Sequence, residues 1–166
     1  MKSIYLTGFM GAGKTTIGKA LGKYLEMPVF DTDQEIEKKE KRTINELFER
    51  QGEAYFRACE TSILGELPKE DAVITTGGGI ICKDENRQLL KEQGIVIFLF
   101  ASEEEIAKRL ERDETRPLLR GDKLERIGTL YKERLPIYKN AADYIIDTTG
   151  KEIGEVVREI VICLNL

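Results

Sequence analysis

The stretch that decides the fold is Gly8-Phe9-Met10-Gly11-Ala12-Gly13-Lys14-Thr15, which directly follows the apolar run Ser3–Thr7. It satisfies the pattern Gly-x-x-x-x-Gly-Lys-Ser/Thr in full, and it lies between a predicted strand and a predicted helix, as this pattern requires. Glycines let the backbone wrap closely around a phosphate and point its N–H groups inward. The helix that begins near Lys14 adds the positive end of its dipole. The stretch therefore predicts a loop that binds nucleotide phosphates.

Two side chains of this loop have predicted chemical roles. Lys14 should reach the β- and γ-phosphates, and the Thr15 hydroxyl should bind Mg²⁺. From residue frequencies, the pattern arises by chance in fewer than about one in a hundred chains of this length. We therefore expect a phosphate site rather than an ordinary glycine-rich turn.

Strand-like and helix-like stretches alternate along all 166 residues. Helical patterns separate the strands, and two of them open with capping-box signals at Thr43 and Ser102. Strands separated by helices imply parallel pairing, because parallel neighbours need a crossover connection. We expect residues 1–166 to form a single three-layer α/β domain of the P-loop NTPase type. The predicted strands are Ser3–Thr7, Pro28–Asp31, Ala72–Thr76, Ile95–Ala101 and Asp143–Asp147.

Composition excludes several classes of function. The net charge of −4 argues against a nucleic-acid binder that relies on a broad basic surface. The longest apolar run, Ile95–Ala101, is too short to cross a bilayer, and no signal peptide precedes Ser3, so we expect a cytoplasmic protein without membrane contact. The three cysteines are far apart, which argues against a disulfide framework or a zinc site. The absence of histidine excludes a histidine base.

Polar residues follow two of the predicted strands, where ligands bind in an open parallel sheet. The second strand ends in Asp31-Thr32-Asp33, whose two carboxylates could serve a cation and a substrate hydroxyl. As an alternative, Asp33 could simply cap the next helix. The third strand ends in Thr76-Gly77-Gly78-Gly79, and three glycines in a row suggest that a ligand approaches the backbone closely, although a plain turn is the alternative.

Two arginines stand out in the helical patterns. Arg57 follows Phe56, where a surface arginine with a packed stem is the alternative to a ligand contact. Arg134 lies within an apolar stripe, so its charge needs a partner, and Pro136 weakens the helix shortly after it. Together the two arginines could hold a carboxylate by paired hydrogen bonds. The stripe consists of Ile127, Leu130, Tyr131 and Tyr138.

The segment of residues 112–123 is polar and is broken by Pro117 and Gly121. A surface loop is one interpretation. The other is a mobile lid that carries Arg116, whose charge could stabilise a transferring phosphoryl group.

With these motifs in order, the chain resembles the shikimate kinases, which use ATP to phosphorylate the 3-hydroxyl of shikimate in aromatic amino-acid (chorismate) biosynthesis. The resemblance covers essentially the whole chain. The phosphate loop alone would indicate only a superfamily, whereas the ordered set is specific to this family. It implies a nucleoside monophosphate kinase-like fold with five parallel strands in the order 2-3-1-4-5. The motifs are GFMGAGKTT at Gly8–Thr16, FDTD at Phe30–Asp33, EAYFRACE at Glu53–Glu60, TTGGG at Thr75–Gly79, TRPLL at Thr115–Leu119 and ERLPIY at Glu133–Tyr138.

The resemblance also implies roles for individual residues, with Lys14, Asp33 and Arg116 as the catalytic set. One Mg²⁺ per subunit would bind Thr15 directly and Asp31 through water. Around ATP, the implied residues are Gly11, Ala12, Gly13, Lys14, Thr15 and Thr16 at the phosphates, Arg109 on adenine and Arg116 from the lid. Around shikimate, they are Asp33 at the hydroxyls, Arg57 and Arg134 at the carboxylate, Gly78 and Gly79 through backbone N–H groups, and Phe48, Phe56 and Glu60 shaping the pocket.

One departure and several alternatives stay open. Some relatives place an adenine-contacting arginine near the final turn before the last helix, where this chain reads Asp147-Thr148-Thr149-Gly150-Lys151. Lys151 could replace it only as a point charge without a stacking plane. Whether Asp33 removes the hydroxyl proton or only orients the hydroxyl is open. Besides a monomeric shikimate kinase that binds shikimate and ATP, the alternatives are a P-loop kinase for gluconate or a nucleoside monophosphate, and a nucleotide-binding module without turnover.

Overall fold

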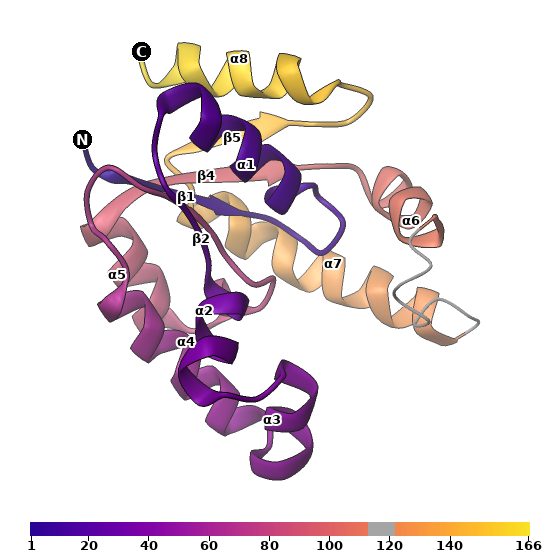
Figure 1. The fold of residues 1–166 in the computed structure, drawn as a ribbon. Coiled ribbons are helices and arrows are strands. Elements are labelled where there is room, and N and C mark those ends of the chain that lie inside the picture. Colours follow the sequence, from indigo (N-terminus) through magenta and orange to yellow (C-terminus); the bar gives the residue numbers. More distant parts are fainter. Residues whose placement is uncertain (113–121) are drawn as a thin grey trace.

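The core is a five-stranded parallel sheet with the strand order β2-β3-β1-β4-β5 (Figure 1). The computed structural model describes residues 1–112 and 122–166, with residues 122–124 described as backbone only. The predicted fold class and strand order are confirmed, and no predicted strand end is wrong by more than one residue. The strands are β1 (Ser3–Thr7), β2 (Val29–Asp31), β3 (Val73–Thr75), β4 (Gly94–Phe100) and β5 (Tyr144–Asp147).

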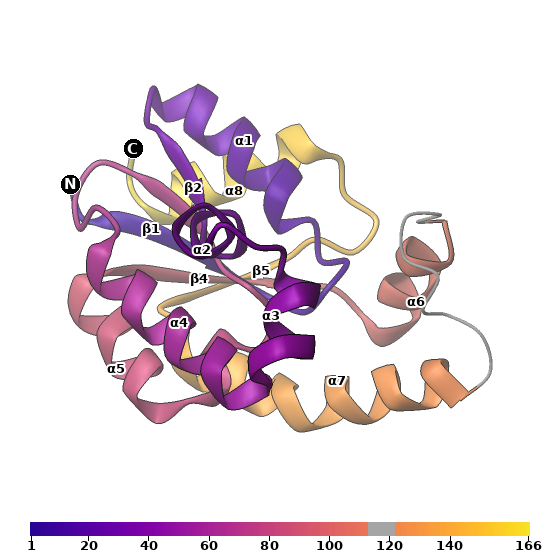
Figure 2. The ribbon, with the colours of Figure 1, turned by 60° about the horizontal axis from the view of Figure 1, so that its bottom comes forward.

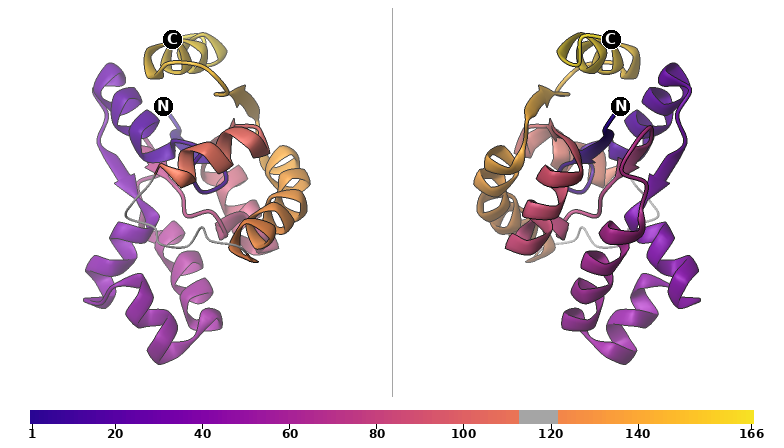
Figure 3. Two further views of the ribbon diagram at one scale, coloured as in Figure 1. Left: turned by 90° about the vertical axis from the view of Figure 1, so that its right-hand side faces the viewer. Right: turned by 90° about the vertical axis from the view of Figure 1, so that its left-hand side faces the viewer.

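Helices cover both faces of this sheet, so the domain has three layers (Figures 1 and 3). One face carries α1 (Lys14–Leu25) and α8 (Ile153–Cys163). The other carries α4 (Glu53–Glu66), α5 (Asp84–Gln93) and α7 (Asp122–Ala141). The remaining helices are α2 (Thr32–Glu40), α3 (Ile44–Gln51), α6 (Glu103–Glu111) and the short 3₁₀ helix η1 (Ile80–Cys82).

Alternation along β1 divides the core between the two faces. Ile4 and Leu6 pack with residues of α1 and α8, whereas Tyr5 packs with residues of α4, α5 and α7. All three side chains are fully buried, because successive residues of a strand point to opposite faces and both faces are covered. Within the described residues, no helix has the length and apolar character needed to span a membrane.

Local signals fix several helix ends. The Thr43 hydroxyl accepts a hydrogen bond from the N–H of Glu46 at 3.2 Å, and the Ser102 hydroxyl accepts one from the N–H of Glu105 at 3.1 Å. Both predicted helix starts are confirmed. Pro136 does not end α7, which continues to Ala141. The helices α2 and α3 pack on α4 and project away from the sheet beside β2 (Figures 1 and 2).

Candidate active site

The loop between β1 and α1 has the backbone that its glycines predict. Gly11 and Gly13 have φ angles of 80° and 91°, which residues with a Cβ rarely adopt. Gly13 is the N-cap of α1, so the helix begins at Lys14, as the sequence predicts. The Lys14 ammonium donates hydrogen bonds to the carbonyl oxygens of Gly8 at 2.6 Å and Phe9 at 3.1 Å. The strand, loop and helix required for a phosphate loop are therefore all present.

A cavity of about 550 Å³ opens beside this loop. Its wall comes from the loop, from the carboxyl ends of β2 and β3, and from α4 and α7. Residues far apart in the sequence thus meet in one cavity, and Met10, Ile44 and Leu130 line it without having been predicted. The lining residues are Met10, Gly11, Gly13, Lys14, Thr15, Thr16, Asp31, Asp33, Ile44, Phe56, Arg57, Glu60, Thr76, Gly77, Gly78, Gly79, Leu130 and Arg134.

The two aspartates after β2 have different surroundings. Asp31 is the N-cap of α2, since its Oδ1 accepts from the N–H of Gln34 at 3.1 Å. Its Oδ2 accepts from the Thr75 hydroxyl at 2.7 Å. The alternative that Asp33 caps the helix is wrong, because β2 passes directly into α2 and the cap falls two residues earlier.

Asp33 instead lies in the first turn of α2 with its carboxylate in the cavity. Its Oδ1 is buried and has no hydrogen-bond partner among the described residues. Burial raises the pKa of Asp33 to about 6, with a further contribution from Asp31, while Lys14 and Arg57 oppose the rise. A Cβ added to Gly77 would lie 2.8 Å from Oδ1, so this carboxylate packs against the glycine turn.

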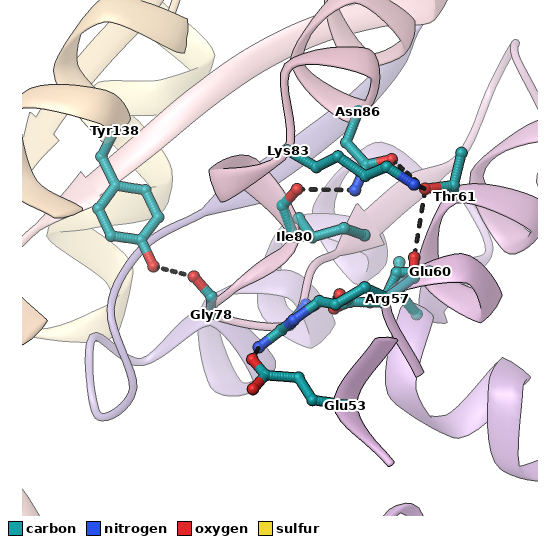
Figure 4. A network of polar contacts seen from close by, with 11 residues as sticks. Glu53, Arg57, Glu60, Thr61, Gly78, Ile80, Lys83, Asn86 and Tyr138 are labelled. Atoms are coloured by element: carbon teal, nitrogen blue, oxygen red, sulfur yellow. Dashed lines mark hydrogen bonds and ion pairs between the residues drawn. The ribbon is translucent and has the colours of Figure 1, made fainter. Parts of the chain in front are cut away.

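Arg57 lies in the cavity wall, and its side chain is 26% exposed. It donates to Glu60 Oε1 at 2.6 Å and to Glu53 Oε1 at 3.4 Å (Figure 4). Glu60 is 1% exposed, its Oε2 has no hydrogen-bond partner among the described residues, and burial raises its pKa to about 6. A buried carboxylate thus fixes the Arg57 guanidinium beside Gly79, where an added Cβ would lie 2.5 Å from its nearest nitrogen.

Arg134 reaches the same cavity from α7. A Cβ added to Gly78 would lie 3.6 Å from its guanidinium, so both arginines border the glycine turn. No carboxylate in the described part of the chain forms an ion pair with Arg134. Phe56 lines the cavity, whereas Phe48 packs on Phe56 with ring centroids 4.9 Å apart and is not part of the lining.

A second cavity of about 250 Å³ shares Gly13 and Thr16 with the first. Arg109 lies in its wall and donates to the carbonyl oxygens of Gly11 and Thr148, each at 3.3 Å. Lys151 also lines it, although its ammonium is paired with Glu159 at 2.9 Å. Thr148 is not among the predicted site residues. The lining residues are Ala12, Gly13, Thr16, Ile17, Arg109, Thr148, Lys151, Ile153 and Val156.

The donor set of the main cavity fits Mg²⁺ that binds together with a nucleotide. The described residues contain no cluster of three or more His, Cys, Asp or Glu side chains that could hold a metal by themselves. Mg²⁺ usually takes one or two protein oxygens together with phosphate and water. The Thr15 hydroxyl and the Asp31 carboxylate, both in the cavity wall, are oxygens of this kind.

Arg116 and most of the predicted lid, about residues 112–123, lie outside the described residues. Their predicted roles stay predictions.

Comparison with known proteins identifies the family. The family described as shikimate kinase matches residues 10–165. A shikimate kinase from Bacillus cytotoxicus is 48% identical over 165 residues, which cover 99% of both chains. The chain belongs to the shikimate kinase family. Another member, from Caldicellulosiruptor saccharolyticus, is 50% identical over 150 residues, covering 89% of this chain and 87% of that protein.

Solved structures agree with this assignment. Shikimate kinase from Acinetobacter baumannii in complex with shikimate has a TM-score of 0.90 and 39% identity, covering 99% of this chain and 94% of that one. A gluconokinase from Sinorhizobium meliloti has a TM-score of 0.59 at 19% identity, covering 99% and 91%, and this likeness shows the fold alone. The family resemblance and the predicted fold are confirmed.

Proposed function

We propose that this chain transfers the γ-phosphoryl group of ATP to the 3-hydroxyl of shikimate, giving shikimate 3-phosphate and ADP. One observation carries the proposal: a single cavity brings the phosphate loop together with Asp33, Arg57 and Arg134. These groups match an acceptor that has both hydroxyls and a carboxylate. Membership of the shikimate kinase family, and the complex of its Acinetobacter baumannii member with shikimate, support the same acceptor.

The nucleotide half of the site consists of the phosphate loop and the second cavity. The N–H groups of residues 11–16 bind the phosphates, and Lys14 neutralises charge on the transferring group. The adenine lies in the second cavity beside Arg109, whose guanidinium is already fixed by hydrogen bonds to the loop and to Thr148. Lys151 offers only a charge paired with Glu159 there, which supports adenine packing on Arg109 instead.

The acceptor half lies across the cavity. Arg57 and Arg134 bind the shikimate carboxylate from two helices, and the N–H groups of Gly78 and Gly79 add donors between them. Glu60 holds Arg57, and Phe56, supported by Phe48, forms an apolar wall. These contacts point the opposite, hydroxyl-bearing side of shikimate toward Asp33.

Transfer makes a bond between the 3-oxygen and the γ-phosphorus and breaks the bond from that phosphorus to the bridging oxygen of ADP. Asp33 orients the 3-hydroxyl and receives its proton. With a pKa of about 6, its carboxylate is largely ionised at neutral pH yet is a stronger base than an ordinary aspartate.

Mg²⁺ would be held by the Thr15 hydroxyl and, through water, by Asp31, and when bound it supplies positive charge to the phosphate oxygens. Arg116 closing over the site within a lid, a monomeric state and a cytoplasmic location stay predictions.

An acceptor screen tests the proposal. Purified protein with Mg²⁺ and ATP should release ADP when shikimate is added, but not with gluconate or a nucleoside monophosphate. ADP release with another acceptor in place of shikimate would make the chain a different kinase. ATP binding without any acceptor-dependent ADP release would favour a nucleotide-binding module.

A further inference from the structure

Two buried side chains that do not line the main cavity hold the glycine turn, residues 77–79, and its continuation at Ile80 (Figure 4). The Tyr138 hydroxyl on α7 donates to the carbonyl oxygen of Gly78. The Asn86 amide on α5 donates to the carbonyl oxygen of Ile80 at 2.9 Å. Tyr138 is 2% exposed and Asn86 is 0% exposed. The turn is therefore anchored from outside the cavity at two carbonyl groups.

The turn needs anchors because consecutive glycines have no side chains to restrict their backbone. Its own backbone bonds, from the Ile80 N–H to Gly77 at 3.2 Å and from the Cys82 N–H to Gly79 at 3.1 Å, do not involve the carbonyl of Gly78. The peptide that joins Gly78 to Gly79 is trans, so its N–H points opposite to its C=O. By holding that C=O, Tyr138 sets the direction of the Gly79 N–H.

Asn86 also connects the turn to the helix that carries Arg57. Its Oδ1 accepts from the Thr61 hydroxyl at 2.7 Å, and Thr61 lies one turn after Arg57 on α4. The Thr61 hydroxyl also lies 3.2 Å from the carbonyl oxygen of Arg57, but its one hydrogen serves the shorter contact to Asn86. The Lys83 ammonium donates to the same hydroxyl oxygen at 3.2 Å. The path from Ile80 through Asn86 and Thr61 thus links the turn to α4.

Tyr138 makes the corresponding connection to the helix that carries Arg134. It lies one turn after Arg134 on α7, so the two side chains share a face of that helix. Its ring stacks on Phe98 of β4, with centroids 5.0 Å apart and planes at 11°. The stack fixes the ring, and the hydroxyl then fixes the turn relative to α7.

We propose that Asn86 and Tyr138 are positioning residues for the acceptor's carboxylate, because they set the spacing between the glycine turn and the two arginines. This rests on the proposed function, in which Arg57, Arg134 and the glycine N–H groups receive that carboxylate. A carboxylate that binds several donors at once needs them at defined separations, and supporting side chains provide that precision. Neither side chain lines the main cavity.

Tyr138→Phe tests the anchor on α7, since it keeps the ring and removes only the hydroxyl. Leaving a buried carbonyl without its donor should raise the KM for shikimate about tenfold, with the KM for ATP unchanged. Tyr131→Phe is the matched control on the same helix. The Tyr131 hydroxyl is also buried and donates to a backbone carbonyl, that of Ala101 at 2.8 Å, but it has no connection to the turn. This control should leave the KM for shikimate unchanged.

A pair of variants at Thr61 tests the anchor on α5, Asn86. If Tyr138→Phe does not fold, this pair is sufficient to test the proposal. Thr61→Val removes the hydroxyl that Asn86 accepts from and should raise the KM for shikimate in the same way. Thr61→Ser keeps the hydroxyl and should behave like the wild type. Equal KM values for the Val and Ser variants would overturn the proposal.

The carboxamide analogue of shikimate separates positioning from general damage. In Tyr138→Phe and Thr61→Val, kcat/KM should fall more for shikimate than for the carboxamide, so the ratio between the two acceptors shrinks. General loss of structure lowers both equally, and an unchanged ratio would contradict the positioning role. If the wild type transfers phosphate to neither acceptor, the proposed function fails and this inference falls with it. If the wild type is active, the ratio of kcat/KM between shikimate and the carboxamide tests the positioning role separately from the proposed function.

Discussion

Asp33 carries a carboxylate where its surroundings oppose a negative charge. Burial and the neighbouring Asp31 raise its pKa to about 6, and Lys14 and Arg57 only partly offset that rise. Its Oδ1 also lacks a hydrogen-bond partner within the described part of the chain. In the absence of ligands this side chain therefore destabilises the fold, while its raised basicity suits proton transfer from a hydroxyl.

Asp33→Asn should raise the free energy of unfolding and lower the turnover. At pH 7 the wild-type carboxylate is ionised in both states and bears the burial penalty only when folded, so the variant should be about 1–3 kcal/mol more stable to unfolding. The gain should shrink as pH falls through about 6 and vanish below 3.8, the value of an ordinary aspartate, where the carboxyl is protonated in both states. Turnover should fall by about a hundredfold or more.

Urea unfolding of the ligand-free protein at pH 7 and pH 4 measures the stability change, and steady-state kinetics measures turnover. Asp84→Asn, which removes an exposed carboxylate on α5, is the control. A variant that is less stable than the wild type at pH 7 would contradict the burial argument. A variant with full turnover would remove Asp33 from the mechanism.

Gly79→Ala tests how closely the glycine turn fits its arginine. The new Cβ would lie 2.5 Å from a nitrogen of the Arg57 guanidinium, so the guanidinium must move away from its place beside the turn. Displacing a carboxylate-binding arginine should cost about 2–5 kcal/mol of shikimate binding while nucleotide binding is retained. Gly65→Ala on α4 is the control, since nothing lies within 4 Å of its added Cβ. Calorimetric titration with each substrate makes the measurement, and unchanged shikimate affinity in Gly79→Ala would refute the argument.

The N-terminus of α2 combines a structural and a proposed metal-binding function in Asp31. The structural part is the cap on Gln34, and the metal-binding part would be the charge of the carboxylate. Asn caps helices as well as Asp does, whereas Ala in place of a capping residue costs about 0.5–2 kcal/mol. The two functions can therefore be separated by substitution.

Asp31→Asn should not lower the melting temperature, because the cap survives and a charge that repels Asp33 is lost. It should raise the Mg²⁺ concentration needed for half-maximal activity, because the charge that would face the metal is lost. Asp31→Ala should lose both the helix cap and the metal-binding charge, so its melting temperature should fall and its Mg²⁺ requirement should rise. Thermal unfolding without metal, together with Mg²⁺ titration of activity and of Mn²⁺ binding in the presence of a non-hydrolysable ATP analogue, gives the two readouts. A normal metal requirement in Asp31→Asn would exclude Asp31 from the metal site.

Elements whose signals are local could be predicted from the sequence. Five apolar runs, two capped helix starts and the Gly8–Thr15 pattern each reflect neighbours within a few residues, and the structure contains them all. Their alternation also predicted the parallel sheet. The strand order came from the family resemblance and not from periodicity, because hydrophobic patterns do not record which strands are neighbours.

The parts of the site that depend on distant contacts could not be predicted from patterns. Whether Asp31 or Asp33 caps α2 depends on whether a loop separates the strand from the helix, and β2 in fact passes directly into α2. Ile44 and Leu130 resemble ordinary core residues in the sequence, yet they line the cavity. The contact of Asn86 with Thr61 joins residues 25 apart, and nothing near either residue signals it.

On the scale of the whole molecule, the fold separates the two substrates while keeping them in contact. The phosphate loop follows the central strand β1 and borders both cavities. Beyond it, the acceptor groups come from α4 and α7 on one face of the sheet, and the second cavity is bordered by α1 and α8 on the other. Mutations should therefore be able to weaken the binding of shikimate and the binding of the nucleotide separately.

Ligand-induced stabilisation of the whole chain tests this separation. Shikimate at a hundred times its Kd should raise the free energy of unfolding by about 2.7 kcal/mol, which is about 5–10 °C in Tm for a domain of this size. In Arg134→Ala, a binding loss of about 2–5 kcal/mol should reduce that gain to below about 1 kcal/mol at the same concentration, with the stabilisation by a non-hydrolysable ATP analogue intact.

Lys14→Met should lose the stabilisation by the ATP analogue and keep the stabilisation by shikimate, since its charge faces the nucleotide. Arg158→Ala on α8 is the control. Within the described residues, the Arg158 guanidinium hydrogen-bonds only to the carbonyl of Gly154, so this variant should be stabilised normally by shikimate and by the ATP analogue. Full stabilisation of Arg134→Ala by shikimate would place the carboxylate elsewhere and remove the basis for a two-substrate cavity.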